Sequence, residues 1–368
     1  MKTKSKLRVG ILFGGKSAEH EVALQSARNV IQAIDKDRFE IVLIGIEKSG
    51  RWQLNDASEY LLNADDPKKV ALVHTTDSVT FVPGERRRQF INIDRNEYLK
   101  PLDVIFPVLH GPFGEDGTVQ GMLKMADIPF VGASVLGSAI GMDKEVTKRL
   151  LHEADLPIPK FMAYKSIWLD KIDYEEVGEK FGYPCFVKPA NMGSSVGITK
   201  VKTLNDLKSA MKIAAQFDEK ILIEEYVKGR EIECSVLGND DPRASLPGEI
   251  LPRHEYYSYE AKYLDENGAR LDVPANLPQE LVNRVRNLAV EAYKVLCCQG
   301  MARVDFFLKD NNKFIINEIN TIPGFTKISM YPKLWEVSGL TYKDLITELI
   351  NLAMQRHEKE KRLKSSYD

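Results

Sequence analysis

Short apolar runs alternate with amphipathic segments at the start of the chain. The run LRVGILF, residues 7 to 13, predicts a buried strand. A second apolar run, EIVLIGI, covers residues 40 to 46, and a third, VIFPVLHG, covers residues 104 to 111. Between the first two runs, apolar residues recur at helical spacing. Strands that alternate with helices in this way predict an α/β section with a parallel sheet and right-handed crossovers.

The first turn of this section contains GILFGGKS, residues 10 to 17, which matches the P-loop pattern G-x-x-x-x-G-K-S. A P-loop needs flexible residues between its glycines, because successive backbone N–H groups must turn around the phosphates. Here three of those positions are apolar and continue the predicted strand, so we interpret the match as accidental. The turn then consists of residues 14 to 17, in which Ser17 is expected to cap a helix with Glu19 in its first turn.

The pattern changes after residue 142, and it changes again near residue 218. A helix, DKEVTKRLLHEA, opens the second section at Asp143, and the strand KILIEEYV at 220 to 227 opens the third. The third section ends in a helix around DLITELINLAMQ, followed by a tail that we expect to be solvated. We therefore predict domains at 1–141, 142–217 and 218–368. Residues 63 to 100 show no period and are interpreted as a polar surface insertion.

Length and composition exclude several classes of protein. The 368 residues are enough for two or three domains, and a net charge of −2 argues against a nucleic-acid protein that neutralises many phosphates. No run approaches the ~20 apolar residues of a membrane span. The four cysteines fit neither a zinc spacing nor a disulfide framework, so a cytoplasmic location is expected.

The segment MARVDFFLKDNNKFIINEIN, residues 301 to 320, predicts a β-hairpin with its turn at Asn311 and Asn312. Asp305 then lies opposite Glu318, and Arg303 lies opposite Asn320, all on one face. The other face would carry core residues, which are Ala302, Val304, Ile315 and Ile319. Such a polar face can be a salt-bridged surface. Two carboxylates and an amide oxygen are also the hard ligands that Mg²⁺ prefers, and with an adjacent arginine they suit phosphoryl transfer.

A nucleotide site is indicated upstream of this hairpin. In CFVKPANMGSSVGITKV, residues 185 to 201, two strands flank a Gly- and Ser-rich loop that can fold over phosphates, and Lys188 directly precedes it. The segment LIEEYVKGREIE then places Glu224, Glu225 and Glu231 around a strand and a turn, available to an amino group and to ribose hydroxyls. Each signal alone is weak, because such loops are often plain connections and such glutamates are often solvated. Their order along the chain strengthens the interpretation.

That order resembles the ATP-grasp superfamily and, within it, the D-alanine:D-alanine ligases, over essentially the whole chain. Seven segments carry the resemblance: GGKSAEHEV at the start, HGPFGEDG at 110, MDKEVTK at 142, KPANMGSSVG at 188, EAKYL at 260, ARVDFF at 302 and NEINTIPGFTKISM at 317. The resemblance implies a Rossmann-like N-terminal domain followed by a two-part ATP-grasp fold, and hence a mixed α/β and α+β chain. The implied activity is ATP-dependent synthesis of D-alanyl-D-alanine for peptidoglycan through a D-alanyl phosphate.

The resemblance also implies roles for residues. The implied ATP site consists of Lys144, Lys188, Ser194, Ser195, Glu224, Glu225, Val227, Glu231 and Lys262. Two Mg²⁺ or Mn²⁺ ions are implied at Asp305, Glu318 and Asn320.

Further implied roles concern the amino acids. Glu19 resembles the residue that binds the ammonium of the first D-alanine, and Ser194 and Tyr263 resemble its hydrogen-bonded partners. Arg303 and the Gly324 N–H would stabilise the oxyanion, and Ser329 with Met330 would hold the second D-alanine. His110 matches a family active-site histidine, although a histidine at a strand end can equally be structural. Lys327 is left without a role.

Some alternatives stay open. The stretch from 253 to 270 resembles a lid over the reaction, but its aromatic residues could also cover core. D-lactate or D-serine could replace the second D-alanine. An alternative from a different class of protein is a P-loop NTPase that binds its nucleotide through GILFGGKS. The expected partners are D-alanine and ATP, with no nucleic acid or membrane, and a homodimer is expected.

Overall fold

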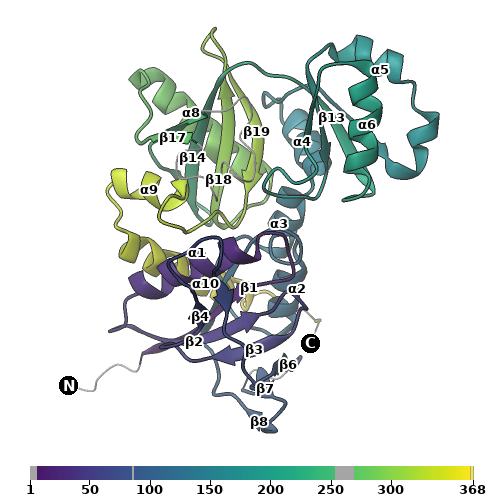
Figure 1. Cartoon of the computed structure of the whole chain (residues 1–368). Coiled ribbons are helices and arrows are strands. Elements are labelled where there is room, and N and C mark those ends of the chain that lie inside the picture. Colours follow the sequence, from purple (N-terminus) through teal and green to yellow (C-terminus); the bar gives the residue numbers. More distant parts are fainter. Residues whose placement is uncertain (1–5, 85–86, 253–268, 365, 368) are drawn as a thin grey trace.

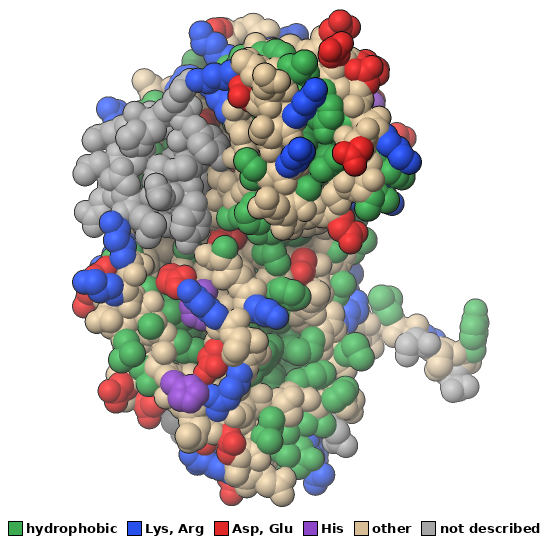
Figure 2. Space-filling model, turned by 45° about the vertical axis from the view of Figure 1, so that its right-hand side comes forward, with side chains coloured by type: hydrophobic (Ala, Val, Ile, Leu, Met, Phe, Trp, Pro, Cys, Tyr) green, Lys and Arg blue, Asp and Glu red, His purple; other side chains and the backbone are tan. Residues whose placement is uncertain are grey.

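The computed structural model describes residues 6–84, 87–252, 269–364 and 366–367. In Figure 1 three units surround a common centre: the N-terminal section at the bottom, a C-terminal sheet at the upper left and a central section at the upper right. Among the described residues, none of the helices combines the length and the apolar character that crossing a bilayer requires. On the face that Figure 2 shows, Lys and Arg side chains are interspersed with Asp and Glu.

The N-terminal section is built on a four-stranded sheet in the order β3-β2-β1-β9. Strands β2, β1 and β9 are parallel and β3 is antiparallel, so the predicted parallel sheet is confirmed. The elements are β1 (Leu7–Gly14), α1 (His20–Ala33), β2 (Phe39–Ile46), β3 (Trp52–Asn55), β9 (Val104–Leu109), α2 (Thr118–Met125) and α3 (Val135–Met142). Ile11, Leu12 and Phe13 are fully buried in β1, which confirms that they are strand residues and not a phosphate loop.

One detail of this section was predicted wrongly. Ser17 does not cap α1, which begins at His20 with Glu19 at the N-cap position. Ser17 instead accepts the N–H of Glu19 and donates its hydroxyl to the carbonyl of His110. Two glycines with positive φ, Gly14 and Gly15, turn the chain between β1 and this contact.

The stretch between β3 and β9 contains two small sheets. Their strands are β4 (Leu61–Leu62), β5 (Ala71–Leu72), β6 (Val79–Phe81), β7 (Phe90–Asn92) and β8 (Glu97–Tyr98). Strands β5 to β8 fall within the region interpreted as a surface insertion, and β6, β7 and β8 lie at the lower end of the molecule in Figure 1.

The central section carries a second sheet in the order β10-β13-β11-β12. Its elements are β10 (Phe161–Lys165), the 3-10 helix η1 (Ser166–Lys171), α5 (Tyr174–Phe181), β11 (Cys185–Pro189), β12 (Thr199–Val201), α6 (Leu204–Ala214) and β13 (Lys220–Glu225). Because β13 pairs with both β10 and β11, it belongs to this sheet and not to the C-terminal section. The boundary predicted at residue 218 therefore lies too early.

The C-terminal sheet has the order β17-β16-β14-β18-β19, and β15 pairs with β14. Its elements are β14 (Arg230–Gly238), β15 (Arg243–Ala244), β16 (Gly248–Pro252), β17 (Ala269–Asp272), α8 (Gln279–Val295), β18 (Gly300–Leu308), β19 (Phe314–Asn320), α9 (Met330–Val337) and α10 (Tyr342–Glu360). The long helix α4 (Lys144–Glu153) packs against this section through Leu151. The predicted terminal helix is confirmed, although Arg356 in the expected solvated tail is buried and donates to the carbonyls of Gly132 and Phe130.

The hairpin of β18 and β19 has the predicted pairings but a different turn. Arg303 pairs with Asn320 and Asp305 pairs with Glu318, as predicted. However, Leu308 pairs with Phe314, which centres the turn on Asn311, and a bulge next to Asp305 then leaves Asn317 without a partner in the ladder. The bulge reverses the alternation beyond it. Ile316, and not the predicted Ile315, is therefore buried.

Candidate active site

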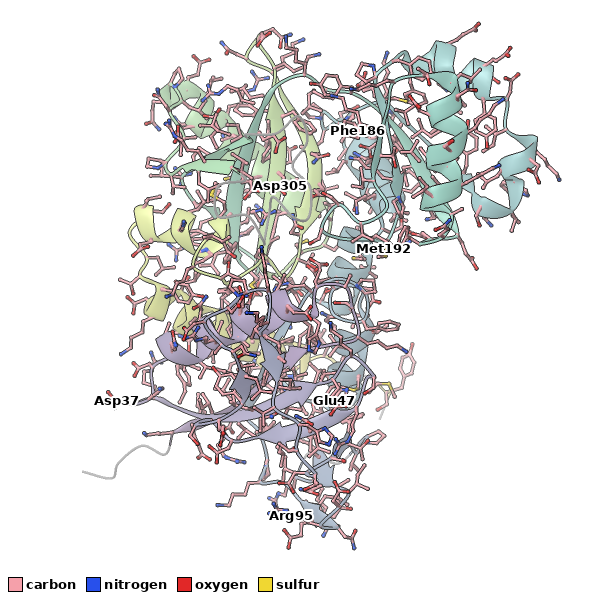
Figure 3. All side chains as sticks on the ribbon, viewed as in Figure 1. Asp37, Glu47, Arg95, Phe186, Met192 and Asp305 are labelled. Atoms are coloured by element: carbon pink, nitrogen blue, oxygen red, sulfur yellow. The ribbon has the colours of Figure 1, made fainter. Side chains whose placement is uncertain are left out.

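A large cavity, of about 680 Å³, lies where the three sections meet. Every predicted site residue that the structure describes lines it, except Lys144, which lines a smaller cavity beside it. In Figure 3, Asp305 marks the C-terminal sheet, and Phe186 and Met192 mark the facing strand and loop of the central section. Tyr263, Lys262 and most of the predicted lid lie outside the described residues.

At the N-terminal end of the cavity, Glu19 is buried and accepts a hydrogen bond from the hydroxyl of Ser194. Ser194 belongs to the loop that joins β11 and β12, where both Ser194 and Ser195 have positive φ. A side chain at Gly193 would bring a Cβ within 2.7 Å of the Glu19 carboxylate, so a larger residue there would displace this carboxylate or the loop. The Gly-rich loop is thus joined to the N-terminal section by a charged hydrogen bond.

A second carboxylate, Glu115, was not singled out from the sequence, although it lies within the HGPFGEDG segment. Its two oxygens accept the backbone N–H groups of Gly111 and Ile322. Burial and the nearby carboxylate of Glu19 raise the pKa of Glu115 to about 8.

His110 is buried, and both of its ring nitrogens have protein partners. Nδ1 lies 3.0 Å from the carbonyl oxygen of Ile322, and Nε2 lies 3.2 Å from the hydroxyl oxygen of Ser26. Since a carbonyl only accepts, Nδ1 carries the proton and Nε2 accepts from Ser26. Ser26 in turn accepts the N–H of Phe325. Burial lowers the pKa of His110 to about 4, so the ring is neutral at physiological pH.

These contacts fix the loop that follows β19. Its residue Gly324 lies opposite Ser329, because a Cβ at Gly324 would be 2.7 Å from the Ser329 hydroxyl oxygen. That oxygen accepts the N–H of Thr326 at 2.9 Å. Met330 follows at the start of α9 and is buried. The Gly324 backbone and Ser329 therefore line one wall of the cavity together.

The predicted metal face projects toward the same cavity. Asp305 accepts two hydrogen bonds from Arg303, at 2.7 and 2.8 Å, and one from the Asn320 amide at 3.0 Å. Arg303 also lies 2.9 Å from Glu233, an acidic neighbour that the sequence did not point to. Among the described residues, no three His, Cys, Asp or Glu side chains form a ready metal cluster. Two carboxylates and an amide oxygen nevertheless fit Mg²⁺, which usually takes few protein ligands and completes its shell with phosphates and water.

The nucleotide-side residues lie on the central sheet. Lys188 on β11 is 2.7 Å from a carboxylate oxygen of Glu224 on β13. Lys144 donates to the carbonyl of Met192 in the Gly-rich loop, and Glu225 accepts the N–H of Lys160. Ser195, Val227 and Glu231 also line the cavity. The positions predicted for phosphates, base and ribose thus converge on one region.

A cavity between two antiparallel sheets, covered by a Gly-rich loop and floored by an acidic hairpin, is the arrangement of an ATP-grasp enzyme. Comparisons with known proteins agree. The family described as D-ala D-ala ligase N-terminus matches residues 8–133, and D-ala D-ala ligase C-terminus matches residues 150–351. The chain belongs to the D-alanine–D-alanine ligase family.

Individual relatives cover almost the whole chain. D-alanine–D-alanine ligase of Oceanobacillus iheyensis is 55% identical over 98% of this chain and 99% of its own length, and D-alanine–D-alanine ligase A of Escherichia coli is 54% identical over the same shares. Among solved structures, the D-alanine-D-alanine ligase from Coxiella burnetii superposes with a TM-score of 0.84 at 36% identity, covering 97% of this chain and 96% of that one. The D-Ala:D-Ser ligase VanG from Enterococcus faecalis gives 0.83 at 35%, covering 95% and 100%. The predicted fold class is confirmed.

Proposed function

We propose that the protein is an ATP-dependent ligase that joins two D-alanine molecules into D-alanyl-D-alanine, releasing ADP and phosphate, and so supplies a peptidoglycan precursor. The observation that carries the proposal is that the Glu19 end, the Lys188 and Glu224 end and the Asp305 hairpin meet in one cavity. Relatives that are 54–55% identical over nearly the full chain bear the same activity in their names.

The first step activates a carboxylate, which is otherwise a poor electrophile. The carboxylate of the first D-alanine attacks the γ-phosphorus of ATP, the bond to the β-phosphate oxygen breaks, and D-alanyl phosphate and ADP result. Glu19 holds the ammonium of this D-alanine, and Lys188 and the Gly-rich loop hold the phosphates. The loop also excludes water, which would hydrolyse the acyl phosphate.

Asp305, Glu318 and Asn320 would hold divalent ions in this site. Mg²⁺, when bound, neutralises charge on the phosphates during transfer. Arg303 lies beside this face and remains available to the acyl phosphate when its contacts with Asp305 rearrange.

In the second step the amine of the second D-alanine attacks the carbonyl carbon of D-alanyl phosphate. A tetrahedral oxyanion forms, and it collapses with loss of phosphate to leave the peptide bond. Arg303 and the N–H of Gly324 stabilise the oxyanion, and one such donor typically contributes about 100- to 1000-fold in rate. Ser329 and the Met330 backbone hold the carboxylate of the second D-alanine.

The second amino acid has an alternative. The similarity to a structure named as a D-Ala:D-Ser ligase supports D-serine as a competing acceptor, and D-lactate is a third candidate. We further propose a homodimer and a cytoplasmic location, where ATP is available to the cleft. For the domains we propose the division expected from the sequence, with the second boundary moved beyond β13.

The test offers D-alanine, D-lactate and D-serine in pairs with ATP and Mg²⁺, and measures ADP release together with product mass. The proposal expects ADP release that depends on D-alanine and a product with the mass of D-alanyl-D-alanine. If the main product were a heavier depsipeptide or mixed dipeptide, the second substrate would be D-lactate or D-serine and not D-alanine. ADP release in the absence of any amino acid would contradict the proposed ligase activity.

A further inference from the structure

A buried trio of charges lies behind the nucleotide end of the cavity. The carboxylate of Glu224 is in contact with two ammonium groups: Lys148 Nζ is 3.1 Å from Oε1, and Lys188 Nζ is 2.7 Å from Oε2. The side chains of Lys148 and Glu224 are 1% and 3% exposed, whereas that of Lys188 is 12% exposed. Lys188 and Glu224 line the cavity, and Lys148 lies behind them.

Burial lowers the pKa of Lys148, and the neighbouring Glu224 carboxylate opposes this effect. The members of the trio also differ in their freedom to move. Burial raises the pKa of Glu224, but the two ammonium groups outweigh burial and hold the pKa at about 2. Glu224 therefore stays ionised, and a buried carboxylate needs a permanent counter-ion. Lys148 can serve as that counter-ion because its Nζ also donates to the carbonyl of Asn317 at 3.2 Å.

The Asn317 carbonyl connects the trio to the predicted metal face. Asn317 is the bulged residue of β19 and directly precedes Glu318. Lys148 belongs to α4, which lies between β13 and β19 in the molecule (Figure 1). One ammonium group thus contacts both the strand that carries Glu224 and the strand that carries Glu318.

We propose that Lys148 is a positioning residue for nucleotide binding: as the fixed counter-ion of Glu224, it allows Lys188 to turn from Glu224 to the phosphates of ATP. This inference rests on the proposed function, since it deepens the account of its ATP site. Without Lys148, Lys188 would be the sole counter-ion of the buried Glu224 carboxylate. If Lys188 then turned to a phosphate, Glu224 would be left as a buried charge with no counter-ion, which is energetically unfavourable. Lys148 itself does not touch the nucleotide.

A double-mutant cycle tests the inference, with ATP affinity measured by calorimetry in the presence of Mg²⁺. Lys148→Met is expected to weaken ATP binding at least tenfold in the wild-type background, with the KM for D-alanine within twofold. In the Glu224→Gln background, where no carboxylate needs a counter-ion, the same change is expected to cost less than threefold. Arg149→Met, an exposed cation at the next position of α4, is the matched control and should leave ATP affinity unchanged.

An equal loss of ATP affinity in both backgrounds would show that Lys148 does not act through Glu224 and would overturn the inference, as would a folded Lys148→Met protein with unchanged affinity. If Lys148→Met alone does not fold, Glu224→Gln is compared with the double variant. A loss above tenfold between those two overturns the inference, and a loss below threefold supports it. The wild-type ADP assay with D-alanine decides the proposed function separately, because it uses none of these variants.

Discussion

Ser194 donates a hydrogen bond to Glu19 across 175 positions of the chain. The contact joins the loop between β11 and β12 to the start of α1, and so joins the section expected to cover the phosphates to the section expected to hold the first amino acid. On the function proposed above, one carboxylate, that of Glu19, both holds this loop and binds the first amino acid.

Ser194→Ala is expected to raise the KM for D-alanine about 10-fold or more, since a hydrogen bond to a charged group contributes about 1.5 to 3 kcal/mol. ATP affinity should change less than the KM for D-alanine, because Lys188 and Glu224 are untouched. Steady-state kinetics with each substrate varied in turn measure both. Ser209→Ala, an exposed serine on α6, is the control. An unchanged KM for D-alanine would show that the hydrogen bond between Ser194 and Glu19 plays no part in D-alanine binding.

Asp305→Asn and Glu318→Gln are each expected to lower turnover by more than about 100-fold while the fold stays intact. With one carboxylate fewer, the positive charge of the metal ions is less fully balanced while they bind the triphosphate. Circular dichroism checks the fold, and ADP release over a Mg²⁺ titration checks turnover. Asp310→Asn, in the exposed turn of the same hairpin, should behave as wild type. Substantial activity of both variants at saturating Mg²⁺ would reject the hairpin as the metal site.

The burial of His110 predicts that the folded protein loses stability on acidification. Burial lowers its folded pKa to about 4, below the unfolded value of about 6.5. The unfolded chain therefore binds more protons below pH 6.5, and the contribution to stability is complete above that pH and is lost as the pH falls toward 4. Between pH 7 and pH 5 the loss amounts to about 2 kcal/mol.

Denaturant unfolding of wild type and His110→Gln at both pH values measures this contribution. Glutamine can donate and accept but does not titrate in this range. The variant should therefore lose about 2 kcal/mol less than wild type between pH 7 and pH 5. Parallel losses in the two proteins would mean that His110 is not held neutral by burial.

The lysine of GILFGGKS gives a fourth prediction. Lys16 is exposed and lies outside the residues that line the described cavity, whereas Lys188 lines it. Lys16→Ala should leave ATP affinity within about threefold, under roughly 0.7 kcal/mol, and Lys188→Ala should weaken it strongly. Calorimetry with ATP compares the two variants. The reverse order of effects would restore the P-loop reading.

The strand runs and the polar face of the hairpin could be predicted from the sequence, because alternation and apolar runs are local signals. The bulge at Asn317 could not, since it depends on how β18 and β19 match along their length. It reversed the inward face and made the assignment of Ile315 wrong. β13 was placed in the wrong section for a similar reason: its sequence predicts a strand but not the partner with which it pairs.

In the candidate site, too, some residues could be predicted from the sequence and others could not. Motif residues such as Glu19 and Asp305 could be selected from the sequence, and the structure places them around one cavity. Glu115 and Lys148 were missed because a buried charge is recognisable only from its partners, which come from elements far apart in the chain. Their sequence signal was only that each lies in a quoted segment, HGPFGEDG or MDKEVTK.

The hydrophobic core around β1 has a consequence for biosynthesis. That core combines residues near the start of the chain, such as Ile11 and Phe106, with Leu345 and Ile350 of α10. While the protein is being translated, α1 can cover part of the apolar face of the first sheet, but this core is complete only once α10 has been made. Nascent chains released before α10 would expose that face, and a ribosome-bound N-terminal section would be a natural client for chaperones until synthesis is nearly complete.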